Sequence, residues 1–273
     1  MDRSTLIALV AGLLQGVFEW LPISSEGNLT IFLTAIGTDP EAAVGLSLFL
    51  HAGTAVSAAA YYRGELRDVL AELPRWRPKS AFGPDRATFT FLAVATLVSG
   101  VVGIAAYLTV EAVMSALTGG AFVAVVGLLL VATGVLQRVA DDFELGGREY
   151  PDFADALLVG VLQGLAILPG VSRSGTTISG LLFRGHDAES SFRLSFLLSI
   201  PAALGAGVLV LADDGVPAIP VEAALLALAV SAVVGFLTIG ALMRVVERVA
   251  FWAVCVGLGA LAMVGGAIIA IGI

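Results

Sequence analysis

Long apolar runs dominate the chain, and six of them are uninterrupted. They cover about residues 44–62, 87–109, 119–137, 192–212, 222–243 and 250–272. Each run is close to the roughly 20 residues that an α-helix needs to cross a hydrocarbon core of about 30 Å. The pattern therefore predicts six transmembrane helices.

Two further apolar stretches, about 5–36 and 154–185, are broken in the middle by Pro, Gly and Ser. Such a break leaves backbone groups that lipid cannot satisfy, so it is tolerated only where protein buries it or where it lines a cavity. Each stretch is typical of two short helices that meet at a loop inside the membrane. We expect an all-α polytopic membrane protein with six transmembrane helices and two re-entrant helical hairpins. If each hairpin spanned the bilayer instead, the chain would cross eight or more times.

The two broken stretches repeat each other when the chain is shifted by 148 residues. Sixteen of the fifty positions 9–58 are identical to their mates without a gap. The polar matches are Gln15 on Gln163, Ser24 on Ser172, Asp39 on Asp187, Glu41 on Glu189 and Ser47 on Ser195. We interpret this as an internal duplication. A single membrane domain over 1–273 then holds repeat 1 at about 1–137 and repeat 2 at about 150–273.

Loop charges predict the orientation in the membrane. The segment 63–86 carries six basic residues and is the most basic loop, so it is expected to be cytoplasmic. The Arg244–Arg248 turn should lie on the same side, and the Asp213–Asp214 turn, which lacks Lys and Arg, should lie outside. Threading the chain through these assignments puts both termini outside and an odd number of spans between the hairpins. The hairpins then enter from opposite sides, as in an inverted-topology repeat.

The composition fits a membrane protein and disfavours several other classes. The 273 residues are 58% hydrophobic and 13% charged, with a net charge of −8. No basic patch with interleaved aromatic residues is present, so no nucleic-acid partner is expected. The single Cys255 lies in an apolar run, which is typical of a buried, inert thiol. The first apolar run lacks a basic n-region, so it is not expected to be a cleaved signal peptide.

The polar patch Pro169–Thr177 interrupts the second broken stretch. It places Arg173 among hydroxyl groups beside a predicted helix start, where free N–H groups and the helix dipole favour an anion. The arginine fork matches phosphate oxygens, and Gly170 permits close backbone approach. We therefore expect a lipid-phosphate cradle rather than a capped helix kink. Its candidate residues are Gly170, Ser172, Arg173, Ser174, Thr176 and Thr177.

The first broken stretch carries a carboxylate deep in apolar sequence. Gln15 and Glu19 are spaced i, i+4, so both lie on one helical face just before Trp20-Leu21-Pro22 ends the helix. A carboxylate at this depth is costly and is typical of a functional group, either a ligand of a divalent cation or a general base. The loop Ser24–Asn28 then mirrors the arginine loop. Glu26 in this loop is either a second metal ligand or an exposed carboxylate, and the pattern favours exposure.

The two histidines give a weaker signal. His51 lies in a predicted span and could approach the site, although packing or hydrogen bonding is the favoured role. His186 lies beside Asp187 at a predicted membrane edge and is expected to be interfacial. Neither a Ser-His-Asp arrangement nor a Cys/His cluster can be read from the sequence, so a serine-hydrolase triad and a zinc site are not expected.

At these residues the chain resembles the undecaprenyl-diphosphatase family of integral membrane enzymes, known from bacitracin resistance. The resemblance covers nearly the whole chain. The segment Gln15–Asn28 is similar to the family's [E/Q]xxxE element and the Pro-x-Ser-Ser-x-Gly-His loop after it, and Pro169–Thr177 is similar to its PGxSRSxxT motif. The family histidine that ends the first motif is Asn28 here. Asparagine can hydrogen-bond a phosphate oxygen or a metal-bound water, but it cannot act as a nucleophile or general acid.

The resemblance implies hydrolysis of a polyprenyl diphosphate to the monophosphate and phosphate, which recycles a lipid carrier in the cell membrane. It also implies a divalent cation, Mg²⁺ or Ca²⁺, a site reached from the outer face, and often a homodimer. Glu19 is implied as the acidic catalytic or metal-binding residue, with Gln15 beside it as a further metal or substrate ligand. Ser25 is implied as a candidate catalytic hydroxyl and Arg173 as a charge-neutralising group; the nucleophile is either water or Ser25. Ser24 and Asn28 complete the substrate-binding set.

Inverted repeats with paired broken helices are also typical of transporters that alternate access across the membrane. A flippase or transporter for a lipid phosphate is therefore the alternative function. The feature that favours the enzyme is Glu19 opposite the arginine loop, because a transporter needs no metal-binding acid there.

Overall fold

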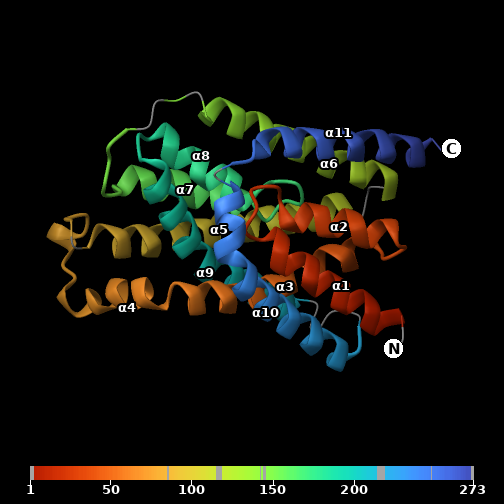
Figure 1. The fold of residues 1–273 in the computed structure, drawn as a ribbon, viewed down its shortest axis with the longest axis horizontal. Helices are drawn as coiled ribbons and strands as arrows, with labels where there is room; N and C mark the ends of the chain where they lie inside the picture. The colour runs from red at the N-terminus through yellow and green to blue at the C-terminus, as the bar shows by residue number, and fades with distance from the viewer. Residues whose placement is uncertain are drawn as a thin grey trace.

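The computed structural model describes residues 3–84, 86–114, 119–141, 143, 146–213, 219–246 and 248–271. Within these residues the chain is all-helical, and the only β-type pairing is an isolated bridge between Arg148 and His186. The α-helices in chain order are α1 (Arg3–Phe18), α2 (Ser25–Ala35), α3 (Pro40–Tyr61), α4 (Arg63–Ala71), α5 (Ala87–Met114), α6 (Gly119–Asp141), α7 (Phe153–Leu165), α8 (Arg173–Phe183), α9 (Ala188–Asp213), α10 (Val221–Val246) and α11 (Phe251–Ala270) (Figure 1). Two 3-10 turns, Leu73–Arg75 and Pro78–Ser80, follow α4.

Among the described residues, six helices are long and apolar enough to cross a membrane by length and composition. These candidate spans are Pro40–Tyr61, Ala87–Thr109, Gly119–Asp141, Ala188–Ala212, Val221–Val246 and Phe251–Ala270. They agree within a few residues with the six runs expected from the sequence, so the prediction of an all-α chain with six apolar spans is confirmed. The broken stretches are also observed as pairs of short helices, α1–α2 and α7–α8, with the breaks at residues 19–24 and 166–172.

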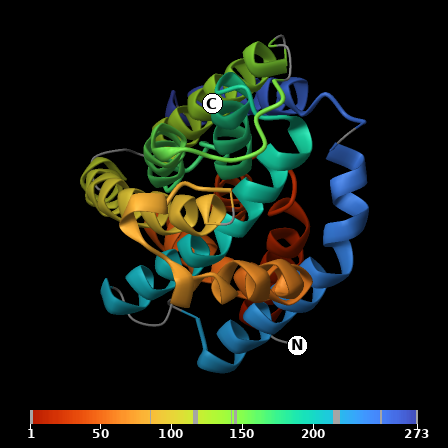
Figure 2. The ribbon, with the colours of Figure 1, turned by 90° about the vertical axis from the view of Figure 1, so that its left-hand side faces the viewer.

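The basic loop 63–86 holds more structure than the sequence pattern indicated. It begins with α4, whose residues are all at least partly exposed, and continues through the two 3-10 turns. Figure 2 looks onto the end of the molecule where this loop lies, drawn in orange. In the expected Asp213–Asp214 turn, Asp214 lies outside the described residues.

Helices from the two halves of the chain pack against each other. Helix α1 packs on α10, α7 on α5, α3 on α9 and α6 on α11. The α6–α11 pair, which runs along one edge in Figure 1, approaches through small residues: a Cβ added to Gly127 would lie 2.6 Å from Gly259 O. Such backbone approach gives tight packing between apolar helices where the hydrophobic effect contributes little.

A buried ionic cluster holds the base of the second hairpin. The side chain of Asp155 in α7 is fully buried and accepts hydrogen bonds from Arg184 Nε at 2.6 Å and Arg148 Nη1 at 3.4 Å. His186 Nε2 lies 3.1 Å from Asp155 Oδ2, and His186 Nδ1 lies 3.0 Å from Arg148 O. His186 is therefore fully buried, and both of its ring nitrogens find partners inside the protein.

Replacing Asp155 by asparagine should destabilise the fold by about 3 kcal/mol, because Arg148, Arg184 and His186 lose the buried carboxylate that they share and only the half-exposed Asp152 still pairs with the arginines. Burial raises the pKa of Asp155, but hydrogen bonds from His186 and Arg184 outweigh burial and hold that pKa below its ordinary value of 3.8. A lowered pKa means that this stabilisation is complete above pH about 4 and is lost as the pH falls below it. Thermal unfolding in detergent measures both effects. The exposed Asp68 of α4, which lies outside the cluster, is the control, and an equal loss in Asp68→Asn would contradict the role of the buried cluster.

Candidate active site

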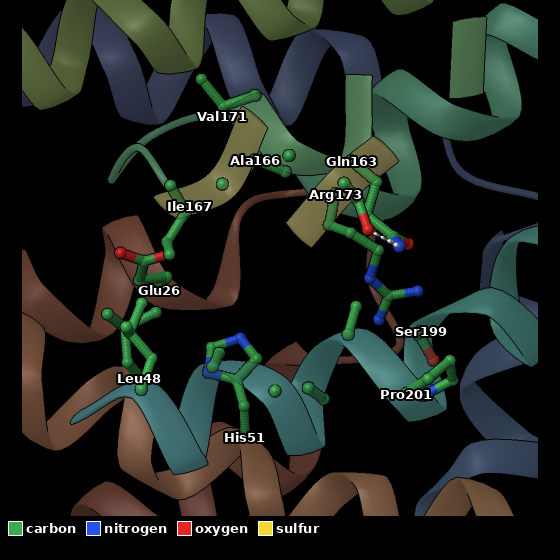
Figure 3. Close-up of a pocket in the computed structure, with 18 of the residues that line it drawn as sticks. Glu26, Leu48, His51, Gln163, Ala166, Ile167, Val171, Arg173, Ser199 and Pro201 are labelled. Atoms are coloured by element: carbon green, nitrogen blue, oxygen red, sulfur yellow. Dashed lines mark hydrogen bonds between the residues drawn. The ribbon is translucent and has the colours of Figure 1, made fainter. Parts of the chain in front are cut away.

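A cavity of about 420 Å³ lies where the two broken stretches meet. Both interhelical loops line it, together with residues from α3, α5 and α9. Figure 3 shows Gln163, Arg173, Ser199 and Pro201 on one side of this cavity, opposite Glu26, Leu48 and His51. The walls are largely apolar, so the polar groups are confined to a small region of the cavity.

Glu19 is the centre of that polar region. Its backbone N–H donates to Gln15 O at 3.1 Å, so it extends the last turn of α1. The neighbouring Trp20 is 1% exposed and donates from its indole to Gly235 O of α10, which fixes the end of the helix. Glu19 Oε2 accepts hydrogen bonds from Gln15 Nε2 at 2.9 Å and from Ser25 Oγ at 2.8 Å. The predicted i, i+4 pair of Gln15 and Glu19 is therefore observed, and the Ser25 hydroxyl donates to the same carboxylate oxygen.

Arg173 reaches Glu19 from the second broken stretch, 154 residues along the chain. Its Nη2 donates to Glu19 Oε1 at 2.5 Å, and its guanidinium carbon lies 5.6 Å from the centre of the Phe196 ring. The other terminal nitrogen, Nη1, is buried and has no hydrogen-bond partner among the described residues. The arginine is thus held by a carboxylate and an aromatic face while one of its donors is left for a ligand.

His51 completes the group around Glu19. Its Nε2 lies 3.2 Å from Glu19 Oε2, and its Nδ1 lies 2.8 Å from Ser47 O, one turn earlier in α3. Both ring nitrogens therefore face acceptors. The sequence left open whether His51 packs or approaches the site, and the structure places it in the cavity wall in hydrogen-bond contact with the central carboxylate.

The two loops press directly against each other. Ser24 caps α2 by accepting from Gly27 N at 3.2 Å, and it also accepts from Gly170 N of the second loop at 3.2 Å. Ser24 adopts φ +58°, the only positive φ of a non-glycine residue in the part of the chain that the structure describes. A Cβ on Gly27 would lie 2.6 Å from Gly170 N. Small residues on both loops are what permit this contact.

Only part of the predicted phosphate cradle faces the cavity. Ser172, Arg173 and Ser174 line it. Thr176 donates to Ser172 O, and Thr177 donates to Arg173 O and contacts Ser195, so both threonine hydroxyls are used within the protein. These threonines and Gly170 do not line the cavity, so the structure places them behind it.

The first loop also divides into lining and supporting residues. Ser24, Ser25 and Glu26 line the cavity. Asn28 does not line it, and its amide donates to Ile23 O at 2.6 Å and Ser24 O at 3.0 Å, which holds the loop in shape. Glu26 was favoured as an exposed carboxylate, but it is only 4% exposed, and its Oε1 is buried without a partner among the described residues. The expectation of exposure is wrong because the loop between α7 and α8 packs against this loop.

The oxygen atoms near Glu19 match a hard divalent cation in chemical type. Gln15 Oε1 and Glu26 Oε1 are both buried and unpartnered among the described residues, and carboxylate and amide oxygens are ligands that Mg²⁺ and Ca²⁺ accept. Within the same residues, no group of three or more His, Cys, Asp or Glu side chains is arranged to hold a metal. The protein therefore offers a few oxygen ligands rather than a complete cage.

The sequence analysis gave no site role to Gln163, Ser99 or Ser199, all of which line the cavity. A signal for two of them was present in the duplication, because a shift of 148 residues places Gln163 on Gln15 and Ser199 on His51. Ser99 lies outside the duplicated stretch and gave no such signal.

Comparisons with known proteins agree with these motifs. A family model described as "Bacitracin resistance protein BacA" matches residues 8–262. A protein named undecaprenyl-diphosphatase from Haloarcula marismortui is 57% identical, covering 97% of this chain and 98% of the relative. Proteins of the same name from Methanococcoides burtonii and Saccharolobus solfataricus are 37% and 34% identical. These two alignments cover 94% and 96% of this chain and 96% and 95% of the relatives.

Proposed function

The chain belongs to the bacitracin resistance protein BacA family, and from that premise we propose that it is a membrane phosphatase. It hydrolyses undecaprenyl diphosphate, or a similar polyprenyl diphosphate, to the monophosphate and inorganic phosphate. The observation that carries this proposal is the cluster of Arg173, Glu19 and Ser25 in an otherwise apolar cavity. Such a cavity suits a ligand with a charged phosphate end and a long hydrocarbon chain.

Each group of the cluster has a task in phosphoryl transfer. Arg173 can hold a phosphate oxygen with its free Nη1 while Nη2 stays on Glu19, which places positive charge where negative charge develops in the transition state. Glu19 can accept the proton of the attacking hydroxyl or water, because Ser25 Oγ already donates to it. A new P–O bond forms at the terminal phosphorus, and the bond to the bridging oxygen breaks. The lipid leaves as the monophosphate and keeps the bridging oxygen.

Two nucleophiles satisfy this scheme. A water beside Glu19 would release phosphate in one displacement. Ser25 Oγ would first form a phosphoserine, which water then hydrolyses. His51 contacts the same carboxylate oxygen as Ser25 and orients it in either case.

A divalent cation is part of the proposal. Glu19, Gln15 and Glu26 are the residues that would hold it, since they supply the oxygen ligands described above. When bound, Mg²⁺ or Ca²⁺ neutralises charge on the phosphate oxygens.

We also propose that α1–α2 and α7–α8 are re-entrant hairpins of an inverted repeat. The support is that α1 packs on α10 while its mate α7 packs on α5, the mate of α10. The cavity wall follows α5 to Ile104 and α9 to Ala212, toward the helix ends that the loop charges predict to lie outside. We therefore infer a multi-pass protein of the cell membrane whose site opens to the outer face. The homodimer implied by the family resemblance is a further prediction, to be measured as the mass of the complex in detergent.

The deciding measurement is phosphate release from undecaprenyl diphosphate by the purified protein. We expect release by the wild type, a drop of about tenfold or more with EDTA, and recovery with added Mg²⁺ or Ca²⁺. Release that EDTA leaves unchanged would contradict the cation but not the phosphatase. If the wild type releases no phosphate in any of these conditions, the phosphatase proposal is wrong.

One observation favours the alternative, a lipid-phosphate transporter. A second cavity of about 280 Å³ lies on the other side of α8 and is lined by residues that include Gln137, Gly175 and Trp252. Cavities on both sides of paired broken helices are typical of alternating access. Translocation of a lipid phosphate in liposomes, without release of phosphate, would support the transporter.

A further inference from the structure

Gln163 in α7 is a buried amide that the proposed chemistry does not use. It is 5% exposed and lines the cavity, and its Nε2 donates to Ser99 Oγ of α5 at 3.3 Å. Ser99 Oγ itself donates to Thr96 O at 3.0 Å, so this hydroxyl can only accept from the amide. The orientation of the amide is thereby fixed. Its Oε1 is buried and has no partner among the described residues.

The amide groups of Gln163 and of its mate in the repeat donate to different partners. Its mate Gln15 donates to Glu19, the residue four positions later. In the second repeat the residue four positions after Gln163 is Ile167, so the carboxylate partner is missing. Gln15 is fully buried behind Glu19 and does not line the cavity, whereas Gln163 does. One copy of the amide thus supports the catalytic carboxylate, and the other is left facing the space where a ligand binds.

The position of Gln163 indicates which part of a ligand it meets. The cavity continues from Gln163 along a slot of small residues, including Gly100 and Gly103 of α5 and Gly205 and Ala206 of α9. Two residues of the cavity wall farther along these helices, Ile104 and Val208, are 52% and 65% exposed, so the slot opens toward the apolar outer surface. A hydrocarbon chain that enters from the membrane would therefore pass Gln163 before it reaches the polar cluster.

The two sides of the cavity then suit two different phosphates. Glu19, Ser25 and Glu26 come from the first broken stretch, whereas Gln163 and Arg173 come from the second, on the side of Ser199 and Pro201 (Figure 3). The phosphate that is attacked must lie beside Ser25 and Glu19. The phosphate bonded to the hydrocarbon chain must lie nearer the slot, and Arg173 lies between them with one donor on Glu19 and one donor free.

We propose that Gln163 and Ser99 form a second phosphate subsite, which binds the phosphate that stays on the lipid. The amide has a second N–H for a phosphate oxygen, and its Oε1 can accept from a protonated phosphate oxygen or a bound water. The subsite rests on the proposed function, because it assigns the two phosphates of that substrate to the two sides of the cavity. With this subsite the protein binds a lipid diphosphate more tightly than free phosphate. The subsite also holds the leaving monophosphate while the P–O bond breaks.

The test compares Gln163→Met with Gln15→Met, the same change at the mate position. Direct binding of undecaprenyl monophosphate to the purified full-length chain gives Kd without turnover. We expect Gln163→Met to raise this Kd and the KM for undecaprenyl diphosphate about tenfold, because one or two hydrogen bonds to a charged phosphate are lost. Inhibition by inorganic phosphate should change less than twofold. Gln15→Met should lower kcat, because Gln15 donates to Glu19.

A second variant keeps the test decisive if Gln163→Met does not fold. The glutamate side chain of Gln163→Glu has the same shape as glutamine and places a negative charge beside the phosphate. We therefore expect the Kd of undecaprenyl monophosphate to rise about 100-fold. Monophosphate binding that is unchanged in both variants, with an active wild type, would overturn the subsite alone. A wild type that binds the monophosphate but releases no phosphate would overturn the proposed function instead, so the two failures are distinguishable.

Discussion

Replacing Arg173 by alanine is expected to lower the rate of phosphate release by about a thousandfold or more. This side chain is the only link between the second loop and Glu19 among the described contacts, and its free Nη1 is the donor best placed for a phosphate oxygen. Without it, the transferring phosphate loses its main positive partner and Glu19 loses an ion pair. Arg173→Lys restores the charge but not the fork, so we expect only partial recovery. Initial rates with undecaprenyl diphosphate measure kcat and KM for both variants.

Arg244→Ala is a matched control for this experiment. Arg244 is exposed near the end of α10, and its Nε donates to Gly240 O of its own helix. Its removal should leave the rate within about twofold, since it lies far from the loops in sequence and contacts neither. An Arg173→Ala enzyme that is folded and keeps more than about a tenth of the wild-type rate would contradict the central role of this arginine.

The geometry of the two loops could be predicted from the sequence, because it depends on helix caps and glycines that are local in the chain. The 148-residue register aligns Ser24 with Ser172, and each serine caps its helix by accepting a hydrogen bond from the N–H of the glycine three residues later, at 3.2 Å. It also aligns Gly37 with Gly185, and both adopt a positive φ at the end of a short helix. Capping and left-handed glycines depend on neighbours in the chain, so repeated residues imply repeated geometry.

Thr176 and Thr177 were predicted to bind phosphate but do not line the cavity, and this difference also has a local cause. A threonine inside a helix can return its hydrogen bond to the carbonyl three or four residues earlier, and both threonines do so. A threonine hydroxyl that donates to its own helix is not free to bind phosphate, so the motif holds fewer phosphate ligands than it holds hydroxyl groups. The structure therefore narrows the cradle to the first residues of α8.

Contacts between distant parts of the chain could not be predicted in the same way. Glu26 is buried because the loop between α7 and α8 packs against the first loop, and His51 reaches Glu19 because α3 packs beside α1. The residues next to Glu26 and His51 in the sequence do not predict either contact. The site is thus built from local motifs that sequence reveals and from tertiary packing that it does not.

Replacing Glu19 by glutamine is expected to lower kcat by about a thousandfold while changing KM little. Glutamine keeps the size of the side chain and can still accept from Ser25 or Arg173, but it can neither take up a proton nor balance the charge of Arg173. Glu26→Gln is the comparison within the same cavity. Its Oε1 has no hydrogen-bond partner among the described residues, so we expect a smaller loss of about tenfold. Phosphate release at saturating undecaprenyl diphosphate measures both variants.

The same variant separates the two roles assigned to Glu19. If Glu19 is mainly a ligand of a divalent cation, then raising Mg²⁺ or Ca²⁺ by about a hundredfold should restore part of the activity, because a weakened site fills at higher concentration. If Glu19 is mainly the general base for Ser25 or water, extra cation cannot replace it and the rate should stay low. The hydrogen bond from Ser25 Oγ to Glu19 Oε2 at 2.8 Å favours the base, so we expect no recovery. Full activity of Glu19→Gln at ordinary cation concentrations would rule out both roles.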